Sequence, residues 1–226
     1  MSKIPEQLAQ VQNRVRSALA AVGRADDAAC LLAVSKKKSA AAIREAFTCG
    51  QTRFGESYLQ EALEKQQQLQ DLPIEWHFIG PIQSNKTRAI AENFDWVHSV
   101  DRARIATRLS DQRPPSLPAL NICVQLNIDA ESTKAGVLPD ELPGVLAEVA
   151  QLPRLRLRGL MAIPARRDDY AGQLQVLRRV AGLLREWRGQ YPHMDTLSMG
   201  MSGDLEAAIA AGSTIVRVGT DIFGER

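Results

Sequence analysis

Residues 196–220 have the sequence TLSMGMSGDLEAAIAAGSTIVRVGT. Two short apolar runs, TLSMG and TIVRVGT, flank a segment rich in alanine that ends on Gly212. That central segment has the composition of a helix, and glycine is the commonest residue just after a helix end. A strand–helix–strand order makes the two strands parallel, because the helix carries the chain back to the starting edge of the sheet. This stretch therefore predicts one unit of an α/β fold.

The same alternation extends towards the N-terminus. The eight apolar runs predicted as strands are CLLAVSK (30–36), TRFGES (52–57), EWHFIG (75–80), WVHSV (96–100), LNICVQLNI (120–128), LRLRGLMAI (155–163), TLSMG (196–200) and TIVRVGT (214–220). The predicted helices between them cover residues 40–50, 57–70, 85–94, 102–112, 139–152, 171–187 and 204–212. Eight is the number of parallel strands that closes a (β/α)8 barrel of the triosephosphate isomerase (TIM) type. An open doubly wound sheet is the alternative, but no GxGxxG motif follows a strand.

The domain organisation follows from length and spacing. A chain of 226 residues is long enough for one large barrel, and its most proline-rich stretch, RPPSLP (113–118), is too short to link two domains. We therefore predict a single barrel domain over residues 1–226. Before the first strand, apolar residues recur at helical spacing with polar residues between them, which predicts an extra N-terminal helix at about residues 3–23 and not a signal peptide. These apolar residues are Ile4, Leu8, Val11, Val15, Leu19 and Val22.

Composition narrows the class of protein. The net charge is only +2, which gives no reason to expect a nucleic-acid or membrane partner. No run of about 18 apolar residues occurs, so no transmembrane helix is expected. The cysteines Cys30, Cys49 and Cys123 are odd in number and lack CxxC spacing, and the three histidines are scattered. We therefore expect neither disulfides nor a metal site, and a cytoplasmic location.

In a barrel of this kind the functional residues lie at the carboxyl ends of the strands. The first predicted strand ends in Ser35-Lys36-Lys37-Lys38. Alternation along a strand places Lys36 on the same face as Leu32 and Val34. A lysine held among apolar neighbours loses solvation, so the pKa of its amine falls and the amine can attack aldehydes. Lys36 is therefore a candidate imine-forming lysine, and a solvated charge run is the alternative.

The seventh and eighth predicted strands end in sequences suited to phosphate. Ser202 and Gly203 precede the helix at residues 204–212, where uncovered amide groups and the helix dipole favour an anion. Gly219 and Thr220 can offer an amide and a hydroxyl to the same phosphate. The alternative for Ser202 is that it only caps the helix.

Arg217 lies within the apolar run of residues 214–220, where a guanidinium is costly unless an anion or an acceptor meets it. It faces either a ligand or an acidic side chain in a buried salt bridge. Among the other residues at strand ends, Glu56 and Asn127 are candidate polar pocket residues, whereas His77, between Trp76 and Phe78, has the pattern of a core residue. Lys86 and Lys134 lie in loops and are expected to face solvent.

Six motifs in this order resemble the pyridoxal-phosphate homeostasis proteins, from about Cys30 to the C-terminus. They are LLAVSKKK, RFGESYLQE, WHFIGPIQSNK, GLMAIP, LSMGMSGDLEAAIAAGST and VRVGTDIFG. The resemblance implies a single barrel like the N-terminal domain of alanine racemase, with pyridoxal 5′-phosphate held as an imine on Lys36. It implies phosphate contacts from Ser202, Gly219 and Thr220, and contact of Arg217 with the pyridine nitrogen. Asn127 and Met201 complete the set of cofactor-binding residues that we predict.

Two positions depart from the family pattern. The usual Gly-Glu-Asn is Gly55-Glu56-Ser57, which removes an amide side chain near the cofactor ring. The lysine is usually followed by Thr-Lys-Pro or a similar sequence, and here Lys37-Lys38-Ser39 follows, so an adjacent amine competes for the aldehyde.

The resemblance implies a non-catalytic protein that controls the supply of vitamin B6. An arginine at the pyridine nitrogen keeps that nitrogen unprotonated, which weakens the ring as an electron sink. The barrel takes up the whole length, so no second domain is expected, and no tyrosine or cysteine stands at a strand end as a second acid or base. We expect a cytoplasmic monomer whose partners are pyridoxal phosphate and apo-enzymes that use it. The alternatives are a racemase or decarboxylase of the same fold, and a Schiff-base aldolase without cofactor.

Overall fold

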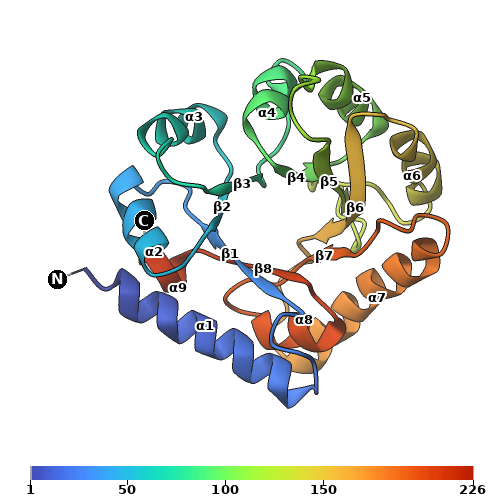
Figure 1. The fold of residues 1–226 in the computed structure, drawn as a ribbon. Helices are drawn as coiled ribbons and strands as arrows, with labels where there is room; N and C mark the ends of the chain where they lie inside the picture. The colour runs from blue at the N-terminus through green and yellow to red at the C-terminus, as the bar shows by residue number, and fades with distance from the viewer. Residues whose placement is uncertain (1, 226) are drawn as a thin grey trace.

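The fold is a closed barrel of parallel strands surrounded by helices (Figure 1). It is described by a computed structural model over residues 2–225. Neighbouring strands pair in sequence order, and β8 closes the barrel by pairing with β1. The strands are β1 (Cys30–Val34), β2 (Arg53–Glu56), β3 (Glu75–Phe78), β4 (Trp96–Val100), β5 (Leu120–Leu126), β6 (Leu155–Ala162), β7 (Thr196–Ser198) and β8 (Ile215–Val218). The predicted (β/α)8 barrel is confirmed, and the open sheet is excluded.

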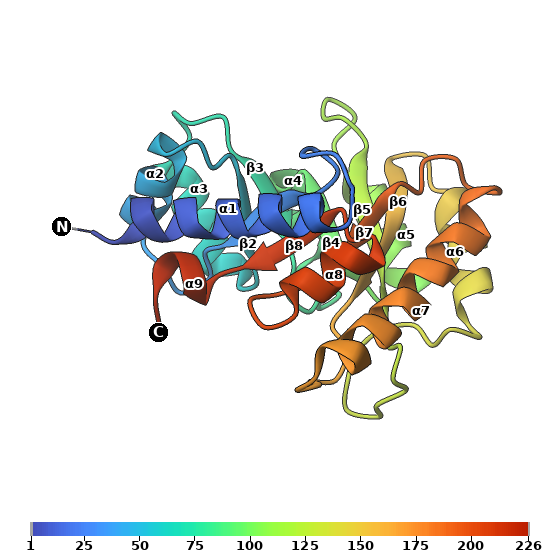
Figure 2. The same cartoon turned by 90° about the horizontal axis from the view of Figure 1, so that it is seen from below.

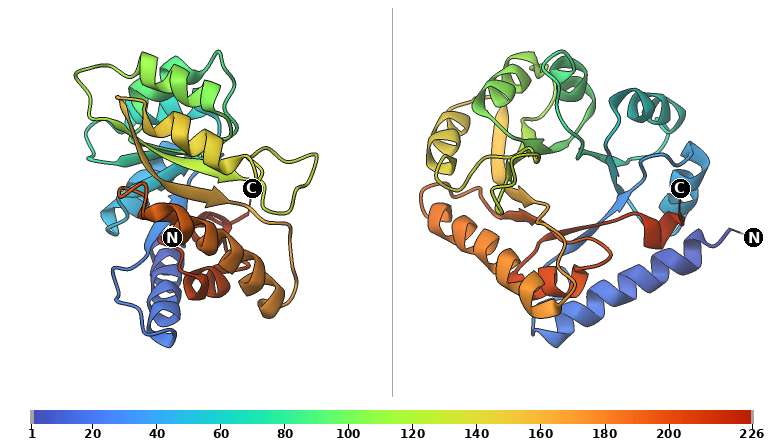
Figure 3. Two further views of the ribbon diagram at one scale, coloured as in Figure 1. Left: turned by 90° about the vertical axis from the view of Figure 1, so that its right-hand side faces the viewer. Right: turned by 180° about the vertical axis from the view of Figure 1, so that it is seen from behind.

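The helices form the outer layer of the barrel (Figure 3). The extra helix α1 (Ile4–Ala21) lies inside its predicted range and packs along α8 and α9 (Figure 2). The other helices are α2 (Ala40–Thr48), α3 (Leu59–Gln68), α4 (Thr87–Asn93), α5 (Ala103–Gln112), α6 (Leu142–Ala150), α7 (Tyr170–Arg188), α8 (Leu205–Ala211) and α9 (Thr220–Phe223). Helix α9 was not predicted, because the run at residues 214–220 was assigned to the last strand.

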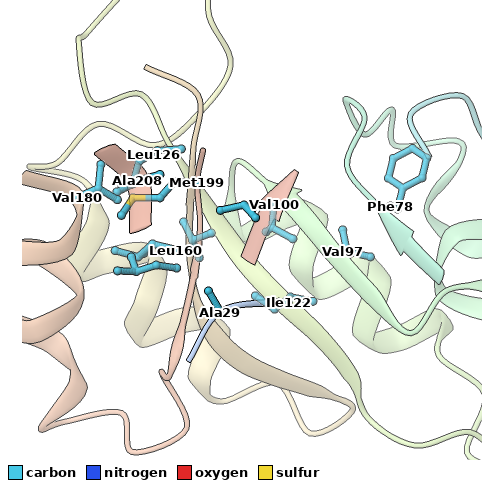
Figure 4. Packing of buried hydrophobic residues seen from close by; sticks show 14 of the residues in the cluster. Ala29, Phe78, Val97, Val100, Ile122, Leu126, Leu160, Val180, Met199 and Ala208 are labelled. Atoms are coloured by element: carbon cyan, nitrogen blue, oxygen red, sulfur yellow. The ribbon is translucent and has the colours of Figure 1, made fainter. Parts of the chain in front are cut away.

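The main hydrophobic core lies between the strands and the outer helices. Figure 4 shows members of this core, including Ile122 and Leu160 from strands and Val180 and Ala208 from helices. The inside of the barrel holds a separate small cluster of Trp96, Cys123 and Met161. Parallel barrel strands are covered on both faces, which explains why their sequences are nearly continuous apolar runs.

Two strand ends that matter for the site differ from the sequence prediction. The first strand, predicted over residues 30–36, ends at Val34, so Lys36 lies in the turn that follows. The run at residues 196–200 is a strand only to Ser198, because Gly200 has a φ of +97°. An added Cβ at Gly200 would lie 2.5 Å from the Cβ of Ala208. Only glycine combines this left-handed backbone with so close an approach to α8, so the chain turns here into the loop before α8.

Residues 2–225 contain no helix with the length and apolar character needed to cross a bilayer. The three cysteines are unpaired, with Cys123 buried and Cys49 exposed. Within the same residues, no group of three or more histidine, cysteine or acidic side chains is arranged to hold a metal ion.

Candidate functional site

The carboxyl ends of the strands form one rim of the barrel, which we call the C-terminal rim. Lys36 lies on it, two residues beyond the end of β1, and is half-buried. Pairing of β1 with β8 sets Leu32 opposite Arg217. Lys36 itself lies in the turn after β1, so strand alternation does not extend to it, and its place beside β8 follows from the pairing of β1 with β8.

The two lysines next to Lys36 have other structural roles. Lys37 is exposed with a φ of +63°, and its ammonium lies 5.8 Å from the centre of the Tyr58 ring. The Lys38 ammonium donates to three carbonyl oxygens at the end of α9, at 2.8 to 3.0 Å. A cation at the carboxyl end of a helix satisfies carbonyl groups that have no partner within the helix. The Lys38 amine thus stabilises the end of α9, and the Lys37 amine lies at the surface beside Tyr58.

The loop after β7 carries Met201, Ser202 and Gly203. Helix α8 begins at Leu205 with Asp204 as its N-cap, so the alternative that Ser202 caps this helix is wrong. The Asp204 carboxylate accepts the amide of Met201 at 2.6 Å. Within the described part of the chain, the amides of Ser202 and Gly203 donate to no protein acceptor. These two donors are therefore suited to an anionic ligand.

Arg217 is buried among main-chain oxygens. Its Nη1 donates to the carbonyl of Ser198 at 2.5 Å and to the Ser198 hydroxyl at 2.7 Å, and its Nη2 donates to the carbonyl of Ala162 at 2.9 Å. Burial lowers its pKa to about 10, so the guanidinium stays charged at neutral pH. No carboxylate pairs with it among residues 2–225, so the buried salt bridge considered as an alternative is wrong. Three of its five N–H donors hold it in place, which leaves two for a ligand.

Gly219 and Thr220 lie where β8 meets β1. A Cβ at Gly219 would lie 3.0 Å from the carbonyl oxygen of Val34, so a side chain there would push β8 away from the strand that carries Lys36. Thr220 is exposed and is the first residue of α9. The structure therefore brings Lys36, Arg217 and the Gly219–Thr220 turn to one section of the rim.

Arg14 holds this section from outside and was missed in the sequence. From α1, its guanidinium donates to both carboxylate oxygens of Glu206 at 2.6 and 2.9 Å, to Asp221 at 3.2 Å and to the carbonyl of Ser202 at 2.7 Å. It thus joins the loop after β7 to α8 and α9. The partners lie about two hundred residues away along the chain, so no local pattern could indicate them.

The remaining predicted residues have other contacts. Asn127 is buried, and its amide group bonds to the main chain of Glu131 and Lys134, so it holds the loop after β5. The side chain of Met201 is exposed, and its residue lines a cavity of about 460 Å³. Glu56 lies under the loop between β1 and α2, where it accepts from Lys65 at 2.8 Å and from Ser35 at 2.6 Å. Burial nevertheless raises the pKa of the Glu56 carboxyl.

A cavity of about 900 Å³ lies at the opposite end of the barrel, around the amino ends of the strands. Its charged residues largely pair with one another, as Arg53 does with Glu75 and Arg158 with Asp195. None of the predicted cofactor-binding residues lines it. The candidate site at the C-terminal rim is therefore chosen for its chemistry and not for the size of a cavity.

Comparison with known proteins agrees with this geometry. Residues 7–226 match the family model described as alanine racemase, N-terminal domain. The alanine racemase of Corynebacterium glutamicum superposes with a TM-score of 0.66 at 19% identity, covering 98% of this chain and 62% of that chain. At this identity the likeness concerns the fold, which is the barrel class that alanine racemases share.

Other relatives are similar at higher identity over their whole length. The pyridoxal phosphate homeostasis protein of Pseudomonas aeruginosa is 57% identical over 226 residues, covering 100% of this chain and 97% of that protein. The protein of that name from Escherichia coli K12 is 54% identical over 229 residues, covering 100% and 98%. PipY of Synechococcus elongatus, solved without PLP, has a TM-score of 0.85 at 38% identity, covering 98% and 100%. PipY solved with PLP bound has a TM-score of 0.81, covering 93% and 100%. The chain therefore belongs to the family of pyridoxal phosphate homeostasis proteins.

Proposed function

We propose that this protein binds pyridoxal 5′-phosphate at the C-terminal rim and takes part in vitamin B6 homeostasis without turning over an amino acid. Lys36 forms the covalent link to the cofactor aldehyde. The observation that carries this assignment is the division of roles among the three adjacent lysines. Lys38 holds α9 and Lys37 is exposed beside Tyr58, whereas Lys36 is half-buried in the turn after β1, the strand that pairs with the strand of Arg217. The names of the curated relatives, and PipY solved with PLP bound, support this choice of ligand.

The cofactor phosphate is assigned to the loop after β7 and the turn after β8. The amides of Ser202 and Gly203 lack protein acceptors within residues 2–225, and the side chains of Ser202 and Thr220 are assigned to the phosphate as two further hydroxyl donors. Gly219 lets the backbone approach without a side chain between it and β1. Amide donors gathered at a loop before a helix are a common protein site for a phosphate dianion.

Arg217 is assigned to the pyridine nitrogen. When bound, pyridoxal phosphate supplies an aldehyde for amines and a ring that withdraws electrons from the attached group. A guanidinium only donates hydrogen bonds, so Arg217 holds the ring nitrogen in its unprotonated form and limits this electron withdrawal. This supports a protein that holds the cofactor in preference to the racemase or decarboxylase alternative.

The covalent assignment is tested by borohydride reduction of the loaded protein and peptide mapping. We expect pyridoxyl phosphate on Lys36. Lys36→Ala should remove the visible absorption band and keep the fold, and Lys37→Ala is the matched control that should keep the band. A label found mainly on Lys37 or Lys38 contradicts the assignment.

The phosphate assignment is tested with the Ser202→Ala and Thr220→Val variants. Each should bind pyridoxal phosphate roughly ten- to a hundredfold more weakly, because a hydrogen bond to a charged group contributes about 1.5–3 kcal/mol. Affinity for unphosphorylated pyridoxal should stay near the wild-type value. Thr107→Val, an exposed change on α5, is the control. Equal losses for both ligands would mean that these residues only shape the loops.

The proposed role is that of a cofactor carrier. The test mixes loaded protein with an apo-aminotransferase and measures the recovery of aminotransferase activity, beside racemisation and decarboxylation assays on a panel of amino acids. We expect reactivation and no sustained turnover. Multiple turnovers that Lys36→Ala abolishes would establish the enzyme alternative. Unpaired cysteines support a cytoplasmic site of action, and we expect a monomer, which sedimentation measures directly.

A further inference from the structure

A line of polar side chains, buried except for Glu75 at its end, crosses the inside of the barrel below the candidate site. The Ser198 hydroxyl, which accepts from Arg217, lies 2.7 Å from Nδ1 of His98. Nε2 of His98 lies 2.8 Å from Nδ1 of His77, and Nε2 of His77 lies 2.8 Å from a carboxylate oxygen of Glu75. The line thus joins β8, β7, β4 and β3, from Arg217 to the large cavity at the other end of the barrel.

The Glu75 end of this line fixes the direction of its hydrogen bonds when both imidazoles are neutral. The Glu75 carboxylate can only accept, so His77 carries a hydrogen on Nε2. In a neutral ring, Nδ1 of His77 then has no hydrogen and accepts from Nε2 of His98. For the same reason Nδ1 of a neutral His98 accepts from the Ser198 hydroxyl, whose oxygen accepts from Arg217.

Both imidazoles are neutral in this arrangement. Each has one nitrogen that accepts and one that donates, which is the pattern of the uncharged ring. An extra proton on His98 would lie in a fully buried position facing the charged Arg217, and burial and these neighbours lower the pKa of His98 well below its ordinary value. Burial also lowers the pKa of His77, although the Glu75 carboxylate acts in the opposite direction.

Packing fixes the orientation of the His77 and His98 rings. The His77 ring is stacked on Trp96 at 5.5 Å between centroids, with 10° between the planes. His98 meets both His77 and Trp96 edge-on, at 5.0 and 5.9 Å. A rotation of either ring that exchanged its two nitrogens would disturb this packing against Trp96.

We propose that Ser198, His98, His77 and Glu75 form a hydrogen-bonded chain of fixed direction that positions the Arg217 guanidinium for the pyridine nitrogen of the cofactor. The contact of Arg217 with that nitrogen rests on the proposed function. Ser198 is the central positioning residue, because its carbonyl and its hydroxyl both hold Nη1. His98 acts through it: by accepting the Ser198 hydrogen, it leaves a lone pair of the hydroxyl oxygen directed at Arg217.

The direction of the chain is tested without cofactor. Nitrogen-15 NMR of the unliganded protein distinguishes the two tautomers of each imidazole and the protonated ring. We expect His77 and His98 both to be neutral at pH 7 with the hydrogen on Nε2. A hydrogen on Nδ1, or a protonated ring at either position, overturns the proposal regardless of whether the protein binds pyridoxal phosphate.

The positioning role is tested with Ser198→Ala and with two variants of His98. Asn in place of His98 keeps an acceptor near the position of Nδ1, whereas Leu removes it. Ser198→Ala and His98→Leu should bind pyridoxal phosphate roughly two- to tenfold more weakly, as loss of one neutral hydrogen bond implies, and should shift the visible band of the bound cofactor. His98→Asn should bind nearly as the wild type does.

A matched control separates positioning from packing. Ser213 is also a fully buried serine whose hydroxyl bonds only to main-chain oxygens between β7 and β8. If Ser213→Ala changes the band and the affinity as Ser198→Ala does, the proposal is overturned. Borohydride labelling of Lys36 in the wild type reports separately on the proposed function, so failure of the chain and failure of cofactor binding are distinguishable. Melting temperatures identify any variant that has lost its fold. If Ser198→Ala or His98→Leu does not fold, the comparison of His98→Asn with the wild type tests the proposal, and weak binding by a folded His98→Asn would overturn it.

Discussion

Replacement of Arg14 by Gln should weaken the binding of pyridoxal phosphate although Arg14 lies outside the rim. Its guanidinium lies between the carboxylates of Glu206 and Asp221 and donates to the carbonyl of Ser202. Without it, the loop after β7 loses a tie to α1, and two carboxylates near the proposed phosphate loops lose their counter-charge. Both changes act against a phosphate dianion.

The size of the effect follows from these contacts. Arg14, Glu206 and Asp221 are each about one third to one half exposed, so each ion pair contributes only about 0.2–1 kcal/mol to stability. The bond to Ser202 adds about 1 kcal/mol. The free energy of unfolding should therefore fall by about 1–3 kcal/mol, which lowers the melting temperature by roughly 3–9 °C for a chain of this length. Only the Ser202 tie and the counter-charge act on the phosphate, so its affinity should fall roughly two- to fivefold.

The assay compares Kd for pyridoxal phosphate and for pyridoxal by fluorescence titration at low and high salt. The loss should be confined to the phosphorylated ligand and should shrink at high salt, because screening weakens the exposed carboxylates. Arg16→Gln is the matched control, since it removes the same charge from α1 and Arg16 bonds only to Asn13 on that helix. Equal losses for both ligands, or a result indistinguishable from Arg16→Gln, would refute the reasoning.

Three further predictions concern reactivity, backbone and pH. Burial raises the pKa of the Cys123 thiol to about 12, so a thiol reagent should label exposed Cys49 rapidly and Cys123 only on unfolding; rapid modification of Cys123, read by mass spectrometry, would contradict this. Gly200→Ala puts a side chain at a φ of +97° and 2.5 Å from Ala208, so thermal unfolding should show a loss of about 2–4 kcal/mol, and an unchanged melting temperature would argue against the turn. The pKa of His98 is lowered from 6.5 in the native state, so below about pH 6.5 the unfolded chain takes up a proton that the native chain does not, and stability should fall by up to about 1.4 kcal/mol per pH unit. Urea unfolding between pH 5 and 7 should show that the free energy of unfolding depends less steeply on pH for His98→Asn than for the wild type. Equal pH dependences would contradict the lowered pKa of His98.

The barrel could be predicted from the sequence because each strand is an apolar run bounded by helix signals. Gly212, for example, ends α8 in the left-handed conformation with a φ of +106°. The boundaries were less accurate where a turn begins inside an apolar run. Residues 199–200 and 219–220 were assigned to strands, but the chain leaves the sheet before Gly200 and starts α9 at Thr220.

The site was predictable where it depends on the order of the strands and not where it depends on partners distant in sequence. Closure of the barrel brings β1 next to β8, with Leu32 opposite Arg217, but the parity prediction does not extend to Lys36, because β1 ends at Val34 and Lys36 lies in the turn that follows. The role of Lys38 could not be predicted, because its acceptors follow a helix that the sequence did not indicate. His77 was correctly interpreted as a satisfied core residue, but its partner His98 lies on another strand, and single-sequence periodicity carries no information on such a contact.

The two ends of the proposed ligand are held by two separate sets of side chains. Arg14 on α1 fixes the loops assigned to the phosphate from outside the barrel, whereas Ser198 and the imidazoles fix Arg217 from inside. A carrier has to keep its ligand in one orientation while leaving the covalent link open to attack by another amine. Supports that lie below and beside the rim meet the first requirement without covering Lys36, which is half-buried at the mouth of the barrel. An acidic partner at the ring nitrogen would do the opposite of Arg217 and strengthen the ring as an electron sink. In the proposed function, Arg217 therefore both orients the cofactor ring and limits its reactivity towards an amino acid.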